Sequence, residues 1–185
     1  MRLAAGESSY AWRLDPSRMG GAELLDTGWH GAYRLLALAD SRPTEVYALL
    51  ANYHLTALPG EDTATVVVKF ASGQQGILLT SWAFGGEPGA WHFVVNGEHG
   101  AVAGNVNRLI HAPHGFPRGA EREYQTTHAE SYAREVTHFL DVVLDGSPSQ
   151  ATWEHAVRTL QLIRGAYLSA ETNRPVALPE DPTAL

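Results

Sequence analysis

Cysteine is absent from the 185-residue sequence. Its absence excludes disulfide bonds, thiolate metal sites and a cysteine nucleophile. Also missing is any apolar run long enough to cross a lipid bilayer. Residues 1–6 carry one positive charge, but no apolar stretch follows them, so we expect no secretory signal peptide. From these absences we expect a cytoplasmic protein with no membrane partner.

Positive charge is scarce and scattered. There are 13 Lys and Arg residues against 20 Asp and Glu residues, and the formal net charge is −7. A nucleic-acid-binding protein is expected to gather its basic residues into a stripe, and the sequence has none. We therefore expect a small neutral or polar ligand and no nucleic-acid partner.

The composition is that of an ordinary folded domain. The hydrophobic fraction of 44% is typical of a globular protein, and the length suits one domain with its own core. We expect residues 1–178 to form a single substrate-binding and oligomerisation domain. Residues 179–185 contain two prolines and two acidic residues, and we expect them to form a loose tail.

Nucleotide-binding and hydrolase motifs are missing as well. No G-x-G-x-x-G follows a predicted strand and opens a helix, and residues 85–89 (GGEPG) have the wrong spacing. The sequence also has no G-x-x-x-x-G-K-[ST], H-E-x-x-H or G-x-S-x-G motif. We therefore expect that this chain alone binds no dinucleotide.

The hydrophobic pattern predicts the order of secondary-structure elements. The predicted elements are a short strand over 6–14, a helix over 20–39, strands over 44–55, 62–70, 75–84 and 91–96, shorter strands over 101–103 and 107–111, and two C-terminal helices. Because strands and helices are segregated, the pattern predicts an α+β fold with one open, mainly antiparallel sheet and helices packed on one face. Most of 104–119 is predicted to be loop, since it is rich in Gly, Pro and Asn.

The two C-terminal helices have clear boundary signals. Thr127 and Glu130 have the spacing of a capping box, and Gly146 is a natural helix stop. The last helix is predicted to run from Thr152 to Asn173. The first of the two carries an apolar stripe on one face, formed by Tyr132, Val136, Phe139, Leu140 and Val143.

Asp26 and His30 are the main candidates for acid–base chemistry. On the predicted helix they stand four residues apart and therefore share one face. A carboxylate beside an imidazole can orient it and stabilise its protonated form. Gly28 and Gly31 would leave room for a ligand beside the helix, or mark a place where another element packs closely. The ordinary alternative is an exposed acid–histidine pair that stabilises the helix by about 0.2–0.5 kcal/mol.

A set of short segments resembles a known domain. Trp12-Arg13, Asp15-Pro16, Gly20-Gly21, Leu24, the Asp-x-Gly-x-His motif at 26–30 and Leu35-Leu36 occur in that order. With the predicted strands over 61–84, the helices over 132–146 and 153–170, and the end segment 175–178, this order resembles the C-terminal domain of the glucose–fructose oxidoreductase, inositol dehydrogenase and rhizopine-catabolism (Gfo/Idh/MocA) family. The resemblance covers nearly the whole chain.

This resemblance implies roles for the motif and for a missing half. In the family, the residues matching Asp26 and His30 contact a sugar or cyclitol beside the nicotinamide of NAD or NADP. They act with a lysine from an N-terminal Rossmann domain, which has no counterpart here. Lys69, the only lysine, lies in a predicted strand and does not match it. The resemblance therefore implies a polyhydroxylated substrate and a Rossmann-domain partner that supplies the cofactor.

The resemblance also implies self-association. The open sheet of this family commonly packs face to face against another copy, so we expect a homo-oligomer. The aromatic residues that would suit such a face are Trp82, Trp91 and Phe93; each would equally suit a core position under a helix.

Several weaker candidates complete the set. Arg13 and Trp12 are candidates for substrate contact, although a solvated strand arginine is equally typical. Tyr132 is a third candidate, because the family often places a polar residue near that helix start; a core tyrosine is its ordinary alternative. The histidines at 111, 114 and 128 suggest a metal site, but no acidic ligand is near, so we expect no bound metal.

The sequence leaves three functions open. The first is the substrate-binding and catalytic domain of a Gfo/Idh/MocA-like oxidoreductase that does not transfer hydride alone. The second is a cofactor-free lyase or isomerase that uses His30 as its base. The third is an oligomerisation module without catalysis.

Overall fold

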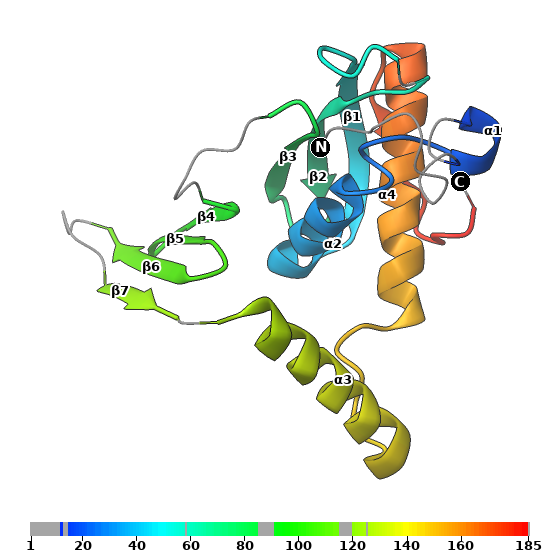
Figure 1. Cartoon of the computed structure of the whole chain (residues 1–185). Helices are drawn as coiled ribbons and strands as arrows, with labels where there is room; N and C mark the ends of the chain where they lie inside the picture. Colours follow the sequence, from blue (N-terminus) through cyan, green and yellow to red (C-terminus); the bar gives the residue numbers. More distant parts are fainter. Residues whose placement is uncertain are drawn as a thin grey trace. The chain divides into compact units, whose positions relative to one another are not determined.

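The computed structural model describes residue 12 and residues 15–57, 59–84, 91–114, 120–124 and 126–184 (Figure 1). The strand predicted over 6–14 lies outside the described residues except for Trp12. The chain divides into two compact units, Met1–Phe84 with Ala151–Leu185 and Gly85–Gln150, which are described separately. Among the described residues, no helix combines the length and apolarity that a bilayer span requires.

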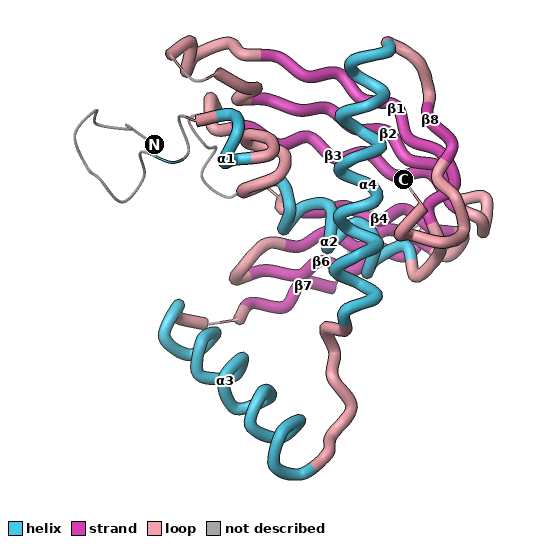
Figure 2. The backbone as a smooth tube through the Cα atoms, turned by 90° about the vertical axis from the view of Figure 1, so that its right-hand side faces the viewer, coloured by secondary structure: helices cyan, strands magenta, loops and turns pink. Residues whose placement is uncertain are grey.

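The first unit contains a four-stranded antiparallel sheet in the order β3-β2-β1-β8. Helix α2 contacts β3, and helix α4 contacts β1. The two helices also contact each other, so both cover the same face of this sheet (Figures 1 and 2). The bounds are α1 Pro16–Met19, α2 Gly28–Ala39, β1 Pro43–Ala51, β2 Thr63–Phe70, β3 Gln75–Ser81, α4 Trp153–Thr172 and β8 Val176–Ala177.

Alternation over the central residues of β1 and β2 separates the two faces of this sheet. Val46 and Ala48 of β1 and Val66 and Val68 of β2 are buried under the helices. The core is completed by side chains from both helices and the flanking loops, which include Leu24, Ala32, Leu162, Ile163, Ala166 and Leu178. This arrangement confirms the predicted α+β class, with antiparallel strands and helices on one face of the sheet.

The opposite face of the first sheet is apolar and exposed. In the strand register, Leu49 and Leu79 flank Thr65 on β2, while Val67 pairs with Ile77. Ile77 is 72% exposed, and Leu49, Val67 and Leu79 are exposed as well. An open face of an antiparallel sheet is usually polar, so this apolar surface is unusual for a face left in water.

Helix α2 begins at Gly28 and not near residue 20, where the sequence predicted its start. Residues 21–27 form turns in which the Asp26 N–H donates to Ala22 and the Gly28 N–H donates to Glu23. These two bonds span four and five residues, so the turn does not continue as a regular helix. The predicted i,i+4 arrangement of Asp26 and His30 on one helix is therefore wrong, because only His30 lies on the helix.

Gly31 and Gly28 bring α2 close to β3. A Cβ atom at Gly31 would lie 2.5 Å from Cδ1 of Leu78, and one at Gly28 would lie 3.1 Å from Cγ2 of Thr80. The close packing that the sequence predicted at these glycines is confirmed. The alternative, that they leave room for a ligand, is wrong, because β3 side chains occupy that space.

Helix α4 begins after Thr152 and ends before Asn173, as the sequence predicted. Asn173 adopts a left-handed conformation with φ 51°. The segment that follows runs back along the helix. The Gln161 side-chain amide donates to the carbonyl of Pro179 at 2.9 Å, and Arg158 donates to the carbonyl of Glu180 at 2.9 Å.

The second unit contains its own four-stranded antiparallel sheet, in the order β4-β5-β6-β7. The strands are thus divided between two sheets, where the sequence predicted one. The bounds are β4 Phe93–Gly97, β5 Gly100–Gly104, β6 Arg108–Pro113 and β7 Ala120–Glu123. The turn between β4 and β5 depends on Gly100, which has φ +144° and whose Cβ, if present, would lie 2.4 Å from the Ala112 carbonyl oxygen.

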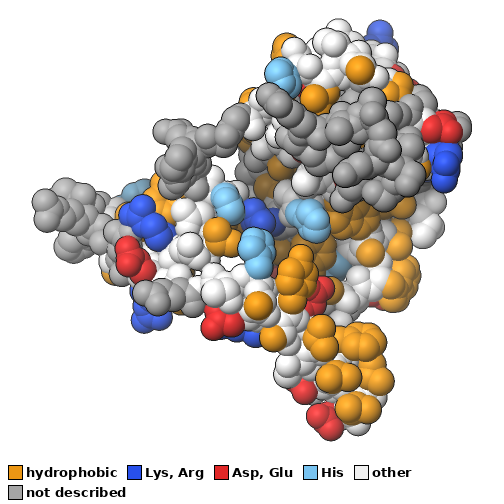
Figure 3. All heavy atoms as spheres, viewed as in Figure 1, with side chains coloured by type: hydrophobic (Ala, Val, Ile, Leu, Met, Phe, Trp, Pro, Cys, Tyr) orange, Lys and Arg blue, Asp and Glu red, His pale blue; other side chains and the backbone are white. Residues whose placement is uncertain are grey.

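Helix α3, His128–Asp145, is the last element of the second unit. Its predicted capping box is present, since Thr127 and Glu130 bond each other's backbone N–H, and Gly146 ends the helix in a left-handed conformation. Its apolar stripe is exposed along its whole length, and Figure 3 shows hydrophobic side chains gathered over α3. Tyr132 is 65% exposed, so its interpretation as a core tyrosine is wrong.

Candidate functional site

The candidate site is the turn over residues 20–27 together with the first turn of α2. Asp26 is half-buried in the turn, and His30 is exposed on the helix, where its N–H donates to the carbonyl of Thr27 at 3.2 Å. An exposed imidazole at the start of a helix can exchange protons with a ligand. Such a group can act on a ligand only if the backbone that carries it keeps it in position.

Tyr167 and Glu61 hydrogen-bond the backbone of this turn. The N–H of Ala22 donates to the Tyr167 hydroxyl at 3.0 Å, and the N–H of Leu24 donates to Oε1 of Glu61 at 3.0 Å. The Tyr167 hydroxyl in turn donates to the same Glu61 oxygen at 2.6 Å. Burial, together with the hydrogen bond to the Glu61 carboxylate, raises the pKa of Tyr167 above its ordinary value, so the phenol keeps its proton.

Glu23 lies within the same turn and is 1% exposed. Its Oε1 accepts a hydrogen bond from the Thr80 hydroxyl at 2.5 Å, and no described residue bonds its Oε2. Burial raises the pKa of Glu23 to about 7, and repulsion from Glu61 and Asp26 adds to the rise. The hydroxyls of Thr80 and Thr27 oppose it but do not cancel it.

Sequence reasoning missed Glu23. The one available signal was its setting between Ala22, Leu24 and Leu25, where a lone acidic residue interrupts an apolar run. A buried carboxyl with an unpaired oxygen is rare in folded proteins and is found more often at functional sites than elsewhere.

Asp62 follows Glu61 and is also fully buried. Burial acts to raise its pKa, but the N–H groups of Leu55, Tyr53 and His54 and the Thr63 hydroxyl outweigh that effect and lower the pKa to about 2. The three N–H bonds are 2.7–3.1 Å long. Asp62 therefore stays ionised and fixes the chain that leaves β1, which is a structural role.

The other predicted site residues are Trp12, Arg13 and Tyr132. Trp12 is exposed, and Arg13 lies outside the described residues. Tyr132 belongs to the second unit and stacks on His128, with ring centroids 6.5 Å apart. Of the aromatics proposed for a sheet face, Trp82 follows β3 in the first unit, whereas Trp91 and Phe93 belong to the second.

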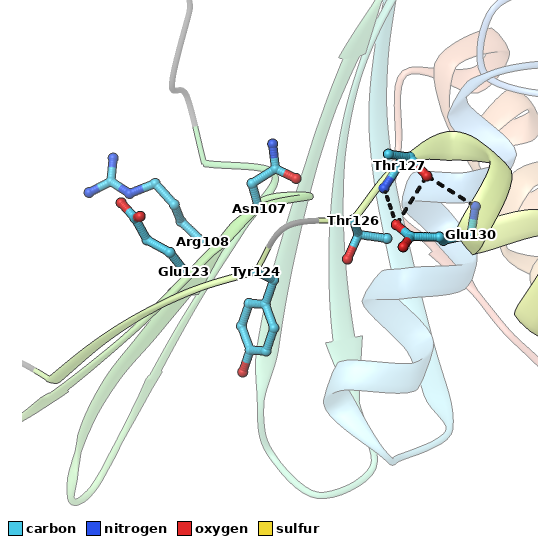
Figure 4. A pocket seen from close by; sticks show the side chains of 7 residues that line it. All are labelled: Asn107, Arg108, Glu123, Tyr124, Thr126, Thr127 and Glu130. Atoms are coloured by element: carbon cyan, nitrogen blue, oxygen red, sulfur yellow. Dashed lines mark hydrogen bonds between the residues drawn. The ribbon is translucent and has the colours of Figure 1, made fainter.

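A groove of about 500 Å³ lies in the second unit (Figure 4). It is lined by Asn107, Arg108, Glu123, Tyr124, Thr126, Thr127 and Glu130. Figure 4 shows that Thr127 and Glu130 are bonded to each other. Arg108 lies 5.2 Å from the ring centroid of Trp91. Two lining residues, Thr127 and Glu130, are therefore engaged with each other.

The histidine cluster suggested by the sequence does not form a metal site in the described part of the chain. Nowhere in that part do three His, Asp or Glu side chains come together as metal ligands would. The ring of His114 instead makes a 3.0 Å hydrogen bond with the carbonyl of Gly97, across the hairpin.

Comparison with models of protein families shows to which family this chain belongs. Residues 1–178 match the family model described as "Oxidoreductase family, C-terminal alpha/beta domain" of the Gfo/Idh/MocA proteins. The chain belongs to this family. A comparison with curated proteins gives no match.

Solved Gfo/Idh/MocA structures share the fold. A levoglucosan dehydrogenase in complex with NADH and levoglucosan has a TM-score of 0.81 at 16% identity, over 92% of this chain and 54% of its own. An aldose–aldose oxidoreductase from Caulobacter crescentus, complexed with glycerol, has a TM-score of 0.75 at 20% identity, over 90% and 50%. An oxidoreductase from Agrobacterium radiobacter, in complex with NAD+, L-tartaric acid and magnesium, has a TM-score of 0.73 at 20% identity, over 85% and 49%. This chain thus spans about half the length of these proteins.

The dinucleotide that occurs in two of these complexes does not fit the described residues of this chain. Every strand pair in the described part is antiparallel. The Rossmann cradle needs a parallel β-α-β unit whose helix N-terminus receives the pyrophosphate. The described part of this Gfo/Idh/MocA domain therefore offers no nucleotide cradle.

Proposed function

We propose that this chain is the substrate-binding and catalytic part of a Gfo/Idh/MocA oxidoreductase that acts on a sugar or cyclitol. A separate dinucleotide-binding domain supplies NAD or NADP. The observation that carries the proposal is the Asp26-x-Gly-x-His30 segment. Hydrogen bonds from a buried polar network fix the turn that presents it. Relatives that act on or bind polyhydroxylated compounds support the substrate class.

The two motif side chains have complementary roles in this proposal. The exposed His30 imidazole exchanges a proton with a substrate hydroxyl, which is the work of a general acid–base group. The half-buried Asp26 carboxylate accepts a hydrogen bond from a second hydroxyl and so fixes the orientation of the ring. Arg13, Trp12 and Tyr132 remain proposals for further substrate contacts.

The hydrogen bonds that Glu61 and Tyr167 make to the turn support the roles proposed for Asp26 and His30. Holding a reacting group in place before the substrate arrives removes part of the entropic barrier of the reaction. Buried polar groups such as Glu61 and Tyr167 are costly unless they are bonded, and here both bond backbone N–H groups of this turn. A flexible surface loop would need no such support.

The test is a binding experiment on this chain. Levoglucosan and myo-inositol are titrated into ¹⁵N-labelled protein, and we expect shift changes confined to residues 20–31. The variants His30→Ala and Asp26→Asn should weaken binding at least tenfold while the melting temperature stays unchanged. His99→Ala, an exposed histidine of the second unit, is the matched control. Tight binding of NAD or NADP to this chain alone would contradict the proposal.

We also propose that two copies pair through the open face of the first sheet. The exposed Leu49, Val67, Ile77 and Leu79 support this, because a patch of this kind is typical of an interface. Sedimentation velocity on Ile77→Lys should show a shift to monomer. The control is Leu144→Lys, an equally exposed leucine of α3, which should leave the oligomer intact. A monomeric wild type would contradict the pairing.

A further inference from the structure

Glu23 is the one buried carboxyl of the turn with an oxygen that no described residue bonds. Its other oxygen accepts from Thr80 of β3, and its own backbone carbonyl accepts from the N–H of Gly28, the first residue of α2. The side chain and the main chain of Glu23 thus tie the turn both to the sheet and to the helix that carries His30.

The ionisable groups that act on Glu23 from the neighbouring elements are acidic. Glu61, which precedes β2, and Asp26, from the turn itself, both repel a negative charge at Glu23. Tyr167 of α4 is a donor, but its hydroxyl bonds Glu61 and not Glu23. The neutral neighbours are Thr80 of β3 and Thr27 of the turn, whose hydroxyls both act to lower the pKa of Glu23 but do not cancel the effect of burial. An ionised Glu23 would therefore be buried, half-bonded and repelled from two sides.

We infer that Glu23 carries a proton in the closed form of the turn, and that this proton positions the segment that presents Asp26 and His30. When the proton is lost, the carboxylate gains free energy by moving toward water, because a buried charge without a full set of partners is unstable. Its movement releases the Gly28 N–H and loosens the first turn of α2. Glu23 is thus a positioning residue whose effect depends on pH.

This inference rests on the proposed function only for its consequence for ligands. With the pKa of Glu23 at about 7, the turn is closed below neutrality and opens as the pH rises above it. Affinity for a polyhydroxylated ligand at the turn should therefore fall from pH 6 to pH 8.5. The opening itself is a property of the protein and is measured without ligand.

Hydrogen exchange of the full chain tests the opening. After correction for intrinsic exchange rates, the amides of residues 22–31 should lose at least tenfold in protection between pH 5.5 and pH 8.5. The Glu23→Gln variant mimics the protonated carboxyl and should remove this pH dependence. Glu171→Gln, which neutralises an exposed carboxylate of α4, should behave like the wild type. Equal pH dependence in wild type and Glu23→Gln would overturn the inference.

A direct titration keeps the inference testable if Glu23→Gln fails to fold. The carboxyl ¹³C signal of Glu23 in the wild type should titrate near pH 7, whereas a midpoint below pH 5 would overturn the inference. The same titration in Glu61→Gln should move the midpoint downward, since one repelling charge is gone. If the turn opens with pH but levoglucosan and myo-inositol do not bind at any pH, the proposed function fails while this inference stands.

Discussion

The indole N–H of Trp82, just after β3, donates a hydrogen bond to the hydroxyl of Thr27, the N-cap residue of α2. Thr27 has a helical backbone conformation and makes no side-chain cap bond to its own helix. The start of α2 is thus fixed by a partner 55 residues away in the sequence. A tie of this kind orients the helix that carries His30 relative to the sheet.

Trp82→Phe should weaken this tie while keeping most of the apolar contact. We expect the free energy of unfolding to fall by about 1 kcal/mol, the usual net value of one hydrogen bond. Urea unfolding measures the change. In a double-mutant cycle, Thr27→Ala and Trp82→Phe together should cost less than the sum of their separate effects, because both remove the same bond. Trp153→Phe, at an exposed indole on α4, is the control and should change nothing; additive effects of the pair would contradict the coupling.

Gly31→Ala separates helix propensity from packing. In an exposed helix this change stabilises by about 1 kcal/mol. Here the new methyl group would meet Leu78 at 2.5 Å, and overpacking typically costs about 1–3 kcal/mol. We expect a net loss of stability in thermal unfolding. Combining it with Leu78→Ala should make the Gly31→Ala step neutral or stabilising, and a stabilising effect of Gly31→Ala in the wild-type background would contradict the close approach.

Local features of this fold were predictable from the sequence. The capping box of Thr127 and Glu130 and the end of the last helix at Asn173 each depend on neighbouring residues, and both are confirmed. The family was also recognisable, because the Asp-x-Gly-x-His motif and the order of segments around it can be read from the sequence. These features need no knowledge of distant partners.

The features that the sequence did not reveal depend on distant contacts. The turn before α2 is held by Tyr167, which is 145 residues from Ala22, and by Glu61. Strand β7, with the sequence AERE, has no hydrophobic alternation and pairs only because β6 lies beside it. The burial of Glu23 follows from the same long-range packing, so helical periodicity alone wrongly extended α2 through it.

Asp62→Asn should reveal how much a buried, fully bonded carboxylate stabilises the fold. The pKa of Asp62 is lowered from 3.8 to about 2, so its charge contributes stability above pH 4 that is lost as the pH falls toward 2. This corresponds to about 2 kcal/mol. Urea unfolding at pH 7 should show at least that loss in Asp62→Asn, and the difference from wild type should shrink at pH 2. A difference that persists unchanged at pH 2 would show that charge is not the cause.

Glu23 should have the opposite pH dependence. Its pKa is raised from 4.5 to about 7, so its contribution to stability is fully present below pH 4.5 and is lost as the pH rises through 7. The full shift corresponds to about 3 kcal/mol, an upper bound that opening of the turn reduces. The measurement is the difference in unfolding free energy between Glu23→Gln and wild type, because other titrating groups cancel in that difference. Glu23→Gln should gain on the wild type from pH 5 to about pH 7 and level off above it, whereas a constant difference from pH 5 to pH 7 would show that Glu23 does not titrate there.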